Sequence, residues 1–117
     1  MNHKELEVWK QSMNLVEIIY QVTNSFPDSE RYGLSQQMRR CAVSIPSNIA
    51  EGAARKGNKE FIQFISIALG SLSELETQLL IGERLAYLNS NNKTFDQLST
   101  VRKLLIGFRN HLKKSPK

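Results

Sequence analysis

The segment from Phe61 to Ala86 places an apolar or small residue at alternating spacings of four and three, without a break. Residues at this spacing share one side of an α-helix and form the heptad-like seam by which helices pack in bundles. The pattern therefore predicts one long helix over residues 58–88 in an all-α protein. The seam comprises Phe61, Ile65, Ala68, Leu72, Leu75, Leu79, Gly82 and Ala86.

Three further segments show the same kind of periodicity and predict three more helices. Two of them cover residues 5–24 and 34–55. The fourth helix is expected to begin at Thr94, because Thr94 and Gln97 have the spacing of a capping box.

Turn-forming residues separate these segments at 24–33 and 89–93, and the sequence has no alternation typical of a strand. A chain of 117 residues can bury a core as one domain without disulfide bonds. We therefore expect a single four-helix-bundle domain over residues 1–117, in which residues 113–117 form a frayed basic tail.

A proline lies in the middle of the second predicted helix, within Ser44-Ile-Pro-Ser-Asn-Ile-Ala-Glu-Gly52. Pro46 cannot donate a hydrogen bond to the carbonyl of Ala42, so the helix is expected to kink there. A proline inside an exposed helix costs ~3 kcal/mol or more, which implies that tertiary packing favours the bend. The residues of this structural motif are Ser44, Pro46, Ser47, Asn48, Glu51 and Gly52.

A polar row follows the same helix at spacings of four, three and four, through Ser44, Asn48, Glu51 and Arg55. Two interpretations of this row are open. It could form an internal network with the third helix, with Ala68, Gly70 and Ser71 near the bend and Glu74 and Gln78 in reach. Alternatively, it could line a ligand-binding or catalytic pocket.

The first predicted helix is apolar on two opposite sides. One stripe comprises Leu6, Trp9, Met13, Val16 and Tyr20. The other, about 180° away at 100° per residue, comprises Val8, Leu15, Ile19 and Val22. One stripe can fill the core of a bundle, and the other then has no partner in a monomer. We assign Val8, Leu15, Ile19 and Val22 to an interface between subunits.

The residue types that carry catalysis or bind metals are scarce. His3 and His111 are the only histidines, and neither follows a glutamate at the spacing of di-iron bundles. The sequence has no glycine-rich phosphate loop, nucleophile elbow or zinc-ligand spacing. We expect no enzyme activity, no cofactor and no metal site.

The only cysteine, Cys41, lies on an apolar stripe and excludes an intrachain disulfide, which is typical of a reducing compartment. The first residues do not resemble a signal peptide, and no stretch approaches the ~20 apolar residues of a membrane span. The expected location is the cytoplasm, without a membrane partner.

Positive charge is concentrated at one end of the chain. The net charge is +5, and the last 21 residues contain six Lys or Arg and no acid. Basic segments of this kind commonly contact phosphates, although they also serve solubility alone. The primary candidates for phosphate contacts are Arg102, Lys103, Arg109, Lys113 and Lys114. The secondary candidates are Arg39, Arg40, Arg55, Lys56 and Lys59.

The proline-containing stretch, followed by Arg55, resembles the hallmark of a small bacterial four-helix-bundle family that includes the 23S rRNA intervening-sequence proteins. The resemblance covers nearly the whole chain as far as about Leu88. It extends to Leu6-Glu-Val-Trp9, Phe26-Pro27, Tyr32-Gly33-Leu34, Arg39-Arg40, Ile67-Ala-Leu-Gly-Ser-Leu72 and Glu74-Leu-Glu-Thr77.

The resemblance implies an antiparallel up-down-up-down bundle that assembles into a homopentamer. The chain is also similar to the accessory protein of diversity-generating retroelements, a basic pentameric bundle that engages nucleic acid and a reverse transcriptase. We therefore expect a non-enzymatic accessory protein that binds RNA or DNA without reading its sequence. The alternative is a structural scaffold that binds a protein partner and no nucleic acid.

Overall fold

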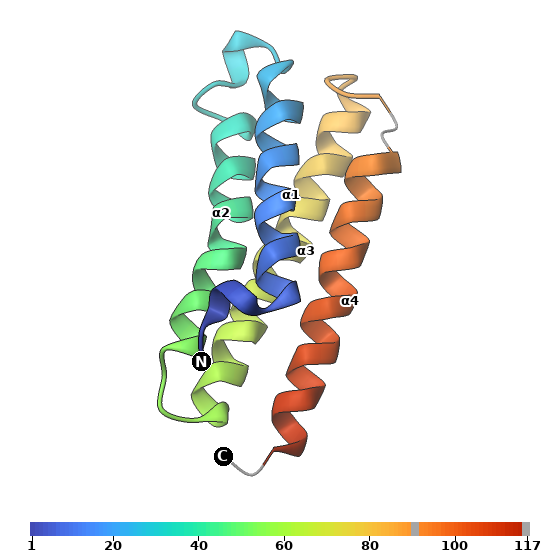
Figure 1. Cartoon of the computed structure of the whole chain (residues 1–117). Coiled ribbons are helices and arrows are strands. Elements are labelled where there is room, and N and C mark those ends of the chain that lie inside the picture. Colours follow the sequence, from blue (N-terminus) through green and yellow to red (C-terminus); the bar gives the residue numbers. More distant parts are fainter. Residues whose placement is uncertain (90–91, 116–117) are drawn as a thin grey trace.

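The computed structural model describes residues 1–89 and 92–115, and this part of the chain contains helices and no strand. The prediction of an all-α four-helix protein is confirmed (Figure 1). The helices are α1 (Glu7–Asn24), α2 (Leu34–Ala53), α3 (Asn58–Arg84) and α4 (Asn92–Lys114). Two short 3-10 helices, η1 (His3–Glu5) and η2 (Asp28–Glu30), precede α1 and α2.

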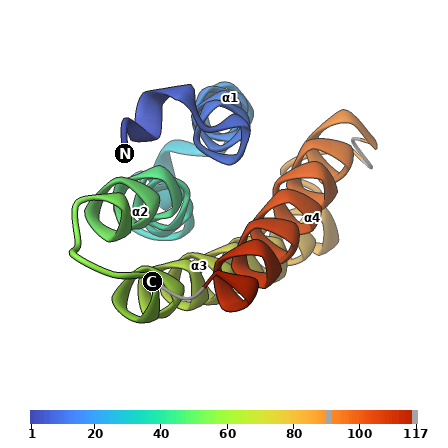
Figure 2. The same cartoon turned by 60° about the horizontal axis from the view of Figure 1, so that its bottom comes forward.

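Each α-helix packs against its neighbours in sequence, and α1 also packs against α4, so the four helices enclose one core. Figure 1 shows successive helices running in opposite directions along an elongated molecule of 48 × 24 × 20 Å. Seen from one end, α1 and α2 lie on one side of the bundle and α3 and α4 on the other (Figure 2). Pro46 is buried inside α2, and the bend at this residue stays a prediction.

The core is built from one apolar stripe of each helix. The predicted seam of α3 is buried from Phe61 to Gly82, as the four-three spacing requires. Fully burying one leucine or isoleucine side chain contributes ~1.5–3 kcal/mol, so this seam is a major source of stability. The largest side chains in the core are Leu15, Ile19, Met38, Ile45, Ile49, Ile65, Leu72, Leu75, Leu79, Leu98, Val101 and Leu105.

The assignment of the two stripes of α1 was wrong. Val8, Leu15 and Ile19 are core residues and Val22 is half-buried, so none of them forms an exposed subunit interface. The sequence pattern hid this because two polar residues, Ser12 and Thr23, share the buried face. Their hydroxyls donate to the carbonyls of Val8 and Ile19, both at 2.7 Å, and this makes their burial tolerable.

The helix α3 ends four residues earlier than predicted, at Arg84. Ala86 adopts a left-handed conformation with φ of 62°. The amide of Tyr87 donates to the carbonyl of Gly82 at 2.9 Å, and that of Ala86 to the carbonyl of Glu83 at 3.0 Å. These two bonds form a Schellman motif, in which the left-handed position is usually a glycine. An alanine gives no sequence signal for the stop.

Both ends of α4 also differ from the prediction. Thr94 does not begin the helix, since α4 starts at Asn92. The side-chain amide of Gln97 reaches α1, where it donates to the carbonyl and the side-chain oxygen of Gln11 at 2.9 and 3.0 Å. At the other end, Lys113 and Lys114 are helical, so the predicted frayed tail is wrong for these residues. Residues 116 and 117 lie outside the described part of the chain.

By length and composition, α3 would be able to span a membrane, whereas the sequence analysis expected no such segment. The window that meets this criterion has a mean hydropathy of 1.3. Core helices of soluble bundles meet the same criterion, and the apolar seam of α3 is buried against its neighbours.

Phe61 and Phe64 of α3 pack tightly against α2 at Gly52. A methyl group at this position would lie 2.5 Å from Cδ1 of Phe61 and 2.9 Å from Cβ of Phe64. The absence of a side chain on Gly52 therefore allows the aromatic ring of Phe61 to enter the core, where it packs edge-on against Phe108 of α4 with centroids 5.1 Å apart.

We predict that Gly52→Ala lowers the free energy of unfolding by about 1–3 kcal/mol, because the new methyl group overlaps Phe61 and Phe64. The control is Gly70→Ala in α3, where the added methyl group meets no atom within 4 Å. The free energy of unfolding of this control should rise by up to about 1 kcal/mol, because alanine has the higher helix propensity. Urea unfolding of both variants tests the prediction, and equal effects of the two substitutions would contradict it.

We also predict that Ala86→Gly raises the free energy of unfolding by about 0.5–1 kcal/mol. Glycine removes ~1–2 kcal/mol of left-handed strain from the folded state, but its greater conformational entropy stabilises the unfolded chain and offsets part of this gain. The control is Ala54→Gly at the C-cap of α2, where φ is −82° and no strain is relieved. Thermal unfolding should order the proteins as Ala86→Gly, wild type, Ala54→Gly. A loss of stability in both variants would show that Ala86 is unstrained.

Candidate nucleic-acid interface

The polar row of α2 divides into a half-buried part and an exposed part. The Ser44 and Ser71 hydroxyls are hydrogen-bonded at 2.9 Å, and the Asn48 amide donates to the carbonyl and the hydroxyl of Ser44 at 2.8 and 2.9 Å. Glu51 and Arg55 are exposed, with Nη2 of Arg55 at 3.8 Å from Oε2 of Glu51. The first half is therefore a network that joins α2 to α3, as the first interpretation held, and the second half is a surface pair.

Cys41 of α2 lies near Glu74 and Gln78 of α3. Burial raises the pKa of its thiol to about 11, and the nearby Glu74 carboxylate acts in the same direction. The Gln78 amide donates to this carboxylate at 3.4 Å and lowers the thiol pKa in part. A thiol with this pKa is protonated near neutral pH, so Cys41 behaves as a small apolar core residue and not as a nucleophile.

Arg102, a primary candidate for phosphate contact, is bound within the protein. Its guanidinium donates to both carboxylate oxygens of Glu76, at 3.0 and 3.5 Å, and ties α4 to α3. The side chain of Arg102 is 29% exposed. A phosphate would have to compete with Glu76 for this guanidinium, so the role of Arg102 in binding stays a prediction without support from its geometry.

Arg39, a secondary candidate for phosphate contact, is likewise engaged within the protein. Its Nε donates to the Thr23 hydroxyl at 2.8 Å and its Nη2 to the Asn24 side chain at 3.0 Å, so it joins α2 to α1. The guanidinium also lies 4.6 Å from the centre of the Tyr20 ring. These partners are neutral, and they hold the charge in place without neutralising it.

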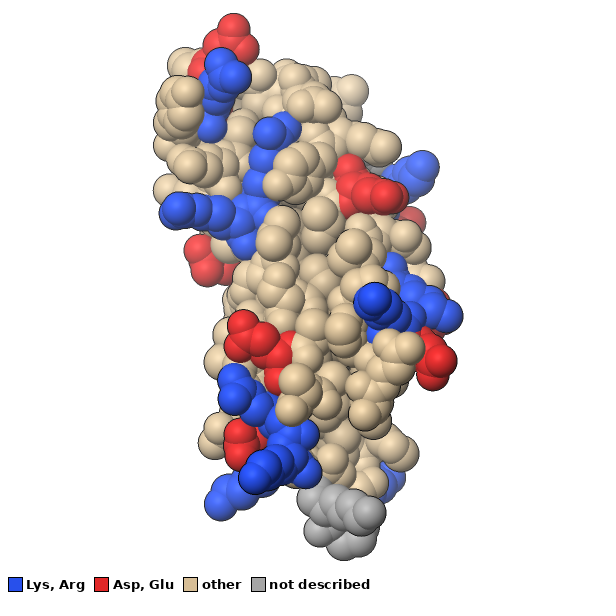
Figure 3. All heavy atoms as spheres, turned by 60° about the vertical axis from the view of Figure 1, so that its left-hand side comes forward, with Lys and Arg blue, Asp and Glu red and all other residues tan. Residues whose placement is uncertain are grey.

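Several other predicted cations do lie together. Lys113 and Lys114 are exposed at the C-terminal end of α4, and Arg55, Lys56 and Lys59 are exposed around the turn from α2 to α3. Figures 1 and 2 show that this turn and the end of α4 lie at the same end of the bundle. We call these five residues the basic end. At the lower end of the molecule in Figure 3, acidic side chains lie among the Lys and Arg side chains and moderate the positive potential.

The two remaining primary candidates precede Lys113 and Lys114 on α4. Lys103 is exposed, and Arg109 is half-buried. Nε of Arg109 is buried and has no hydrogen-bond partner within the described residues. Lys103 can therefore reach a ligand freely, whereas Arg109 can offer only its outer nitrogens.

A surface that the sequence analysis did not assign to binding is the outer stripe of α1 together with α2. Trp9, Met13 and Val16 from α1 and Val43 and Ala50 from α2 line an open groove of about 310 Å³, and we call these five residues the outer apolar face. Met13 is 41% exposed and Val43 is 40% exposed. The stripe that was expected to fill the core is thus the one that faces outward.

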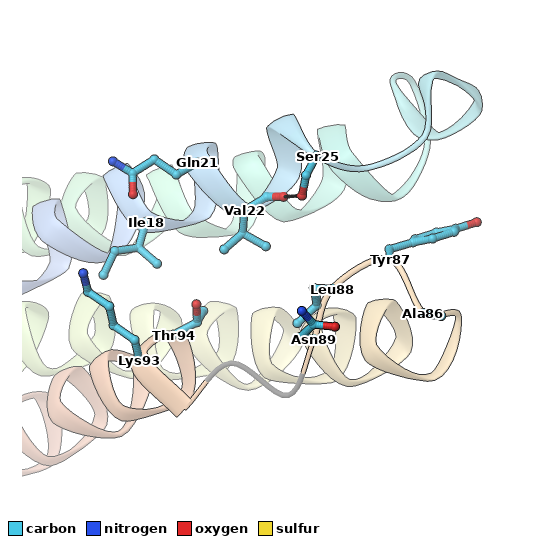
Figure 4. A pocket seen from close by; sticks show the side chains of 10 residues that line it. All are labelled: Ile18, Gln21, Val22, Ser25, Ala86, Tyr87, Leu88, Asn89, Lys93 and Thr94. Carbon is cyan, nitrogen blue, oxygen red and sulfur yellow. Dashed lines mark hydrogen bonds between the residues drawn. The ribbon is translucent and has the colours of Figure 1, made fainter.

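A hollow of about 750 Å³ lies between the C-terminal half of α1 and the segment that joins α3 to α4 (Figure 4). Val22 lines this hollow and points into it, which places it away from the outer apolar face. The Tyr87 hydroxyl points away and donates to Glu30 at 2.9 Å, which raises the pKa of Tyr87. The lining residues within the described chain include no acid, histidine or cysteine.

Residues 1–89 and 92–115 contain no group of three or more His, Cys, Asp or Glu that is arranged to hold a metal ion. The basic end and the outer apolar face therefore offer cations, aromatic rings and apolar side chains to a ligand. Such a surface can bind polyanions and other proteins.

Comparison with known proteins identifies the fold and the family. No curated protein matches the chain. A solved structure from Bacteroides thetaiotaomicron, described as a protein with unknown function from the S23 ribosomal protein family, is similar over 88% of this chain and 95% of its own. The TM-score is 0.80 at 24% sequence identity, which supports the shared fold. The sequence model of one family matches residues 4–107, and the chain therefore belongs to the 23S rRNA-intervening sequence protein family.

Proposed function

We propose that this protein is a non-enzymatic, oligomeric accessory protein of the cytoplasm that binds RNA or DNA without reading its sequence. The observation that carries the proposal is the basic end, where exposed cations from two distant parts of the chain lie together. Lysine is a flexible point charge that contacts phosphate oxygens without specifying a base. The net charge of +5 favours association with a polyanion over long range.

The outer apolar face supports the oligomeric part of the proposal. An isolated bundle leaves Met13 and Val43 exposed next to Trp9 and Val16, in a groove floored by apolar atoms. Contiguous apolar patches of this kind on soluble proteins commonly mark contacts with other chains. Each added copy would contribute another basic end, so several weak phosphate contacts would combine by avidity. The resemblance to pentameric bundles favours a ring of five copies.

A second candidate is a protein-binding scaffold without affinity for nucleic acid. The observation that favours it is a set of exposed apolar side chains spread along α3, namely Ile67, Leu80 and Ile81. A partner protein could occupy either apolar surface. The two candidates differ in whether polyanions bind in the absence of any other protein.

We predict that the protein binds single-stranded and double-stranded oligonucleotides with an affinity that falls steeply with salt. The variant Lys113→Gln/Lys114→Gln should weaken binding several-fold. Each lost phosphate contact should reduce the slope of log affinity against log salt by about 0.7 on single strands. Fluorescence anisotropy at several salt concentrations measures both effects.

The control for this titration is Arg84→Glu, which removes the same net charge from an exposed residue at the C-terminal end of α3. It should retain the wild-type slope. Equal losses in both variants would indicate a response to net charge alone. No binding by the wild type at low salt would exclude the nucleic-acid function and leave the scaffold.

We further predict that the protein sediments as an oligomer of the 13.4 kDa chain, with five copies expected. Met13→Glu/Val43→Glu should dissociate it, because burying two carboxylates in an apolar contact is costly. The control Ile67→Glu changes an exposed residue of α3 and should leave the assembly intact. Analytical ultracentrifugation distinguishes these outcomes, and a wild-type monomer at micromolar concentration would contradict the prediction.

A further inference from the structure

A groove of about 570 Å³ lies beside the N-terminal half of α2, at the opposite end of this helix from the basic end. Arg31, Arg39 and Arg40 line it together with Tyr20 and Tyr32. We call these five residues the arginine–tyrosine groove. Figure 3 shows Lys and Arg side chains gathered over this part of the surface, separate from those at the lower end. The described residues that line the groove include no acid.

The three arginines of the groove have no carboxylate partner within the part of the chain that the structure describes. Arg39 is fixed by the hydrogen bonds that it donates to the neutral side chains of Thr23 and Asn24, and Arg31 and Arg40 are exposed. Asp28 lies in an adjoining hollow that Arg31 and Arg39 also border, but it forms no ion pair with them. Three uncompensated guanidinium groups around one concave surface favour an anionic ligand, and guanidinium matches phosphate in shape and charge.

The two tyrosines give the groove a second property. Tyr32 is 82% exposed, and the Arg31 guanidinium lies 5.9 Å from the centre of its ring. Tyr20 is 41% exposed and is held under Arg39. The ring of Tyr32, which stands in solvent beside a guanidinium group, offers a face on which a nucleobase can stack.

We propose that the arginine–tyrosine groove binds an unpaired nucleotide segment of RNA or DNA, with a phosphate on Arg39 and Arg40 and a base stacked on Tyr32. The inference rests on the proposed nucleic-acid function and specifies its substrate as a single strand. The bases of a single strand are free to stack on an aromatic side chain, whereas the bases of a duplex are held in its own stack. An acidic peptide would satisfy the arginines but would leave the exposed ring of Tyr32 without a function.

The position of the groove agrees with an oligomeric protein. Val43 borders both the arginine–tyrosine groove and the outer apolar face, so the groove lies at the rim of the proposed contact between copies. Assembly through that face would bring the groove of each copy to the edge of the contact with its neighbour. A strand could then pass from one copy to the next, with the basic end contributing phosphate contacts that require no unpaired base.

The experiment compares binding of a labelled single-stranded deoxythymidine 15-mer and a blunt DNA duplex of the same length to the full chain. Tyr32→Ala should weaken binding of the single strand about tenfold or more, as expected for loss of one stacked base, and change duplex binding less than twofold. Tyr32→Phe should keep the wild-type affinity, because it retains the ring. Arg40→Gln should weaken the single strand several-fold, whereas the exposed Arg84→Gln should not.

The outcomes separate this inference from the function on which it rests. Salt-sensitive binding by the wild type, together with unchanged single-strand affinity in Tyr32→Ala, would overturn the groove and leave the proposed function standing. An equal loss for single strand and duplex would overturn the stacking role. Binding of neither probe by the wild type would overturn both. Binding of a poly-glutamate peptide that Tyr32→Ala or Arg40→Gln abolishes, without an effect on the nucleic acids, would reassign the groove to acidic peptides.

Discussion

The packing of α2 against α3 is the constraint on which the other features depend. Gly52 lets Phe61 approach the backbone of α2, and the Ser44–Ser71 hydrogen bond joins the same two helices two turns away. With the contact fixed at these two points, the buried face of α2 is set by geometry. Val43 and Ala50 must then turn outward beside α1, and Arg39 must turn toward Thr23. The outer apolar face and the arginine–tyrosine groove are both consequences of one helix orientation.

This arrangement also gives Ser44 and Asn48 of the polar row a structural role. Ser44 and Asn48 use their hydrogen-bonding groups on each other and on Ser71, and burial keeps the thiol of Cys41 protonated. The bond between Ser44 and Ser71 joins α2 to α3, and Asn48 supports it from within α2. The groups that remain free to meet a ligand are cations and aromatic rings at the surface, and their chemistry suits binding.

The fold could be predicted from the sequence because its signal is repeated many times. The seam of α3 has a core position in every turn from Phe61 to Gly82, and no single exception could disguise it. The stop at Ala86 could not be predicted, since its left-handed conformation follows from the Schellman hydrogen bonds and not from a preference of alanine. The two stripes of α1 were interchangeable by periodicity, and only the position of α1 against its neighbours decides between them.

The candidate site was less predictable for a related reason. Charge patterning identified cations but could not show which of them have partners. Arg102, for example, donates to Glu76 of α3, which lies 26 residues earlier in the sequence. Arg31 and Tyr32 lie in a segment whose composition indicated only a turn, and their significance depends on Arg39 and Tyr20 from two helices. Surface sites assembled from several elements leave little trace in a single sequence, whereas a core leaves a periodic one.

The central claim is that copies associate through the outer apolar face, and the three methionines of the chain allow a direct test. Met1 is exposed, Met38 is fully buried, and Met13 lies on the proposed contact. Hydroxyl-radical footprinting should show Met13 protected nearly as well as Met38 when the protein is concentrated, and increasingly reactive on dilution while Met38 stays protected. Oxidation of Met13 at a rate close to that of Met1 at every concentration would contradict the claim.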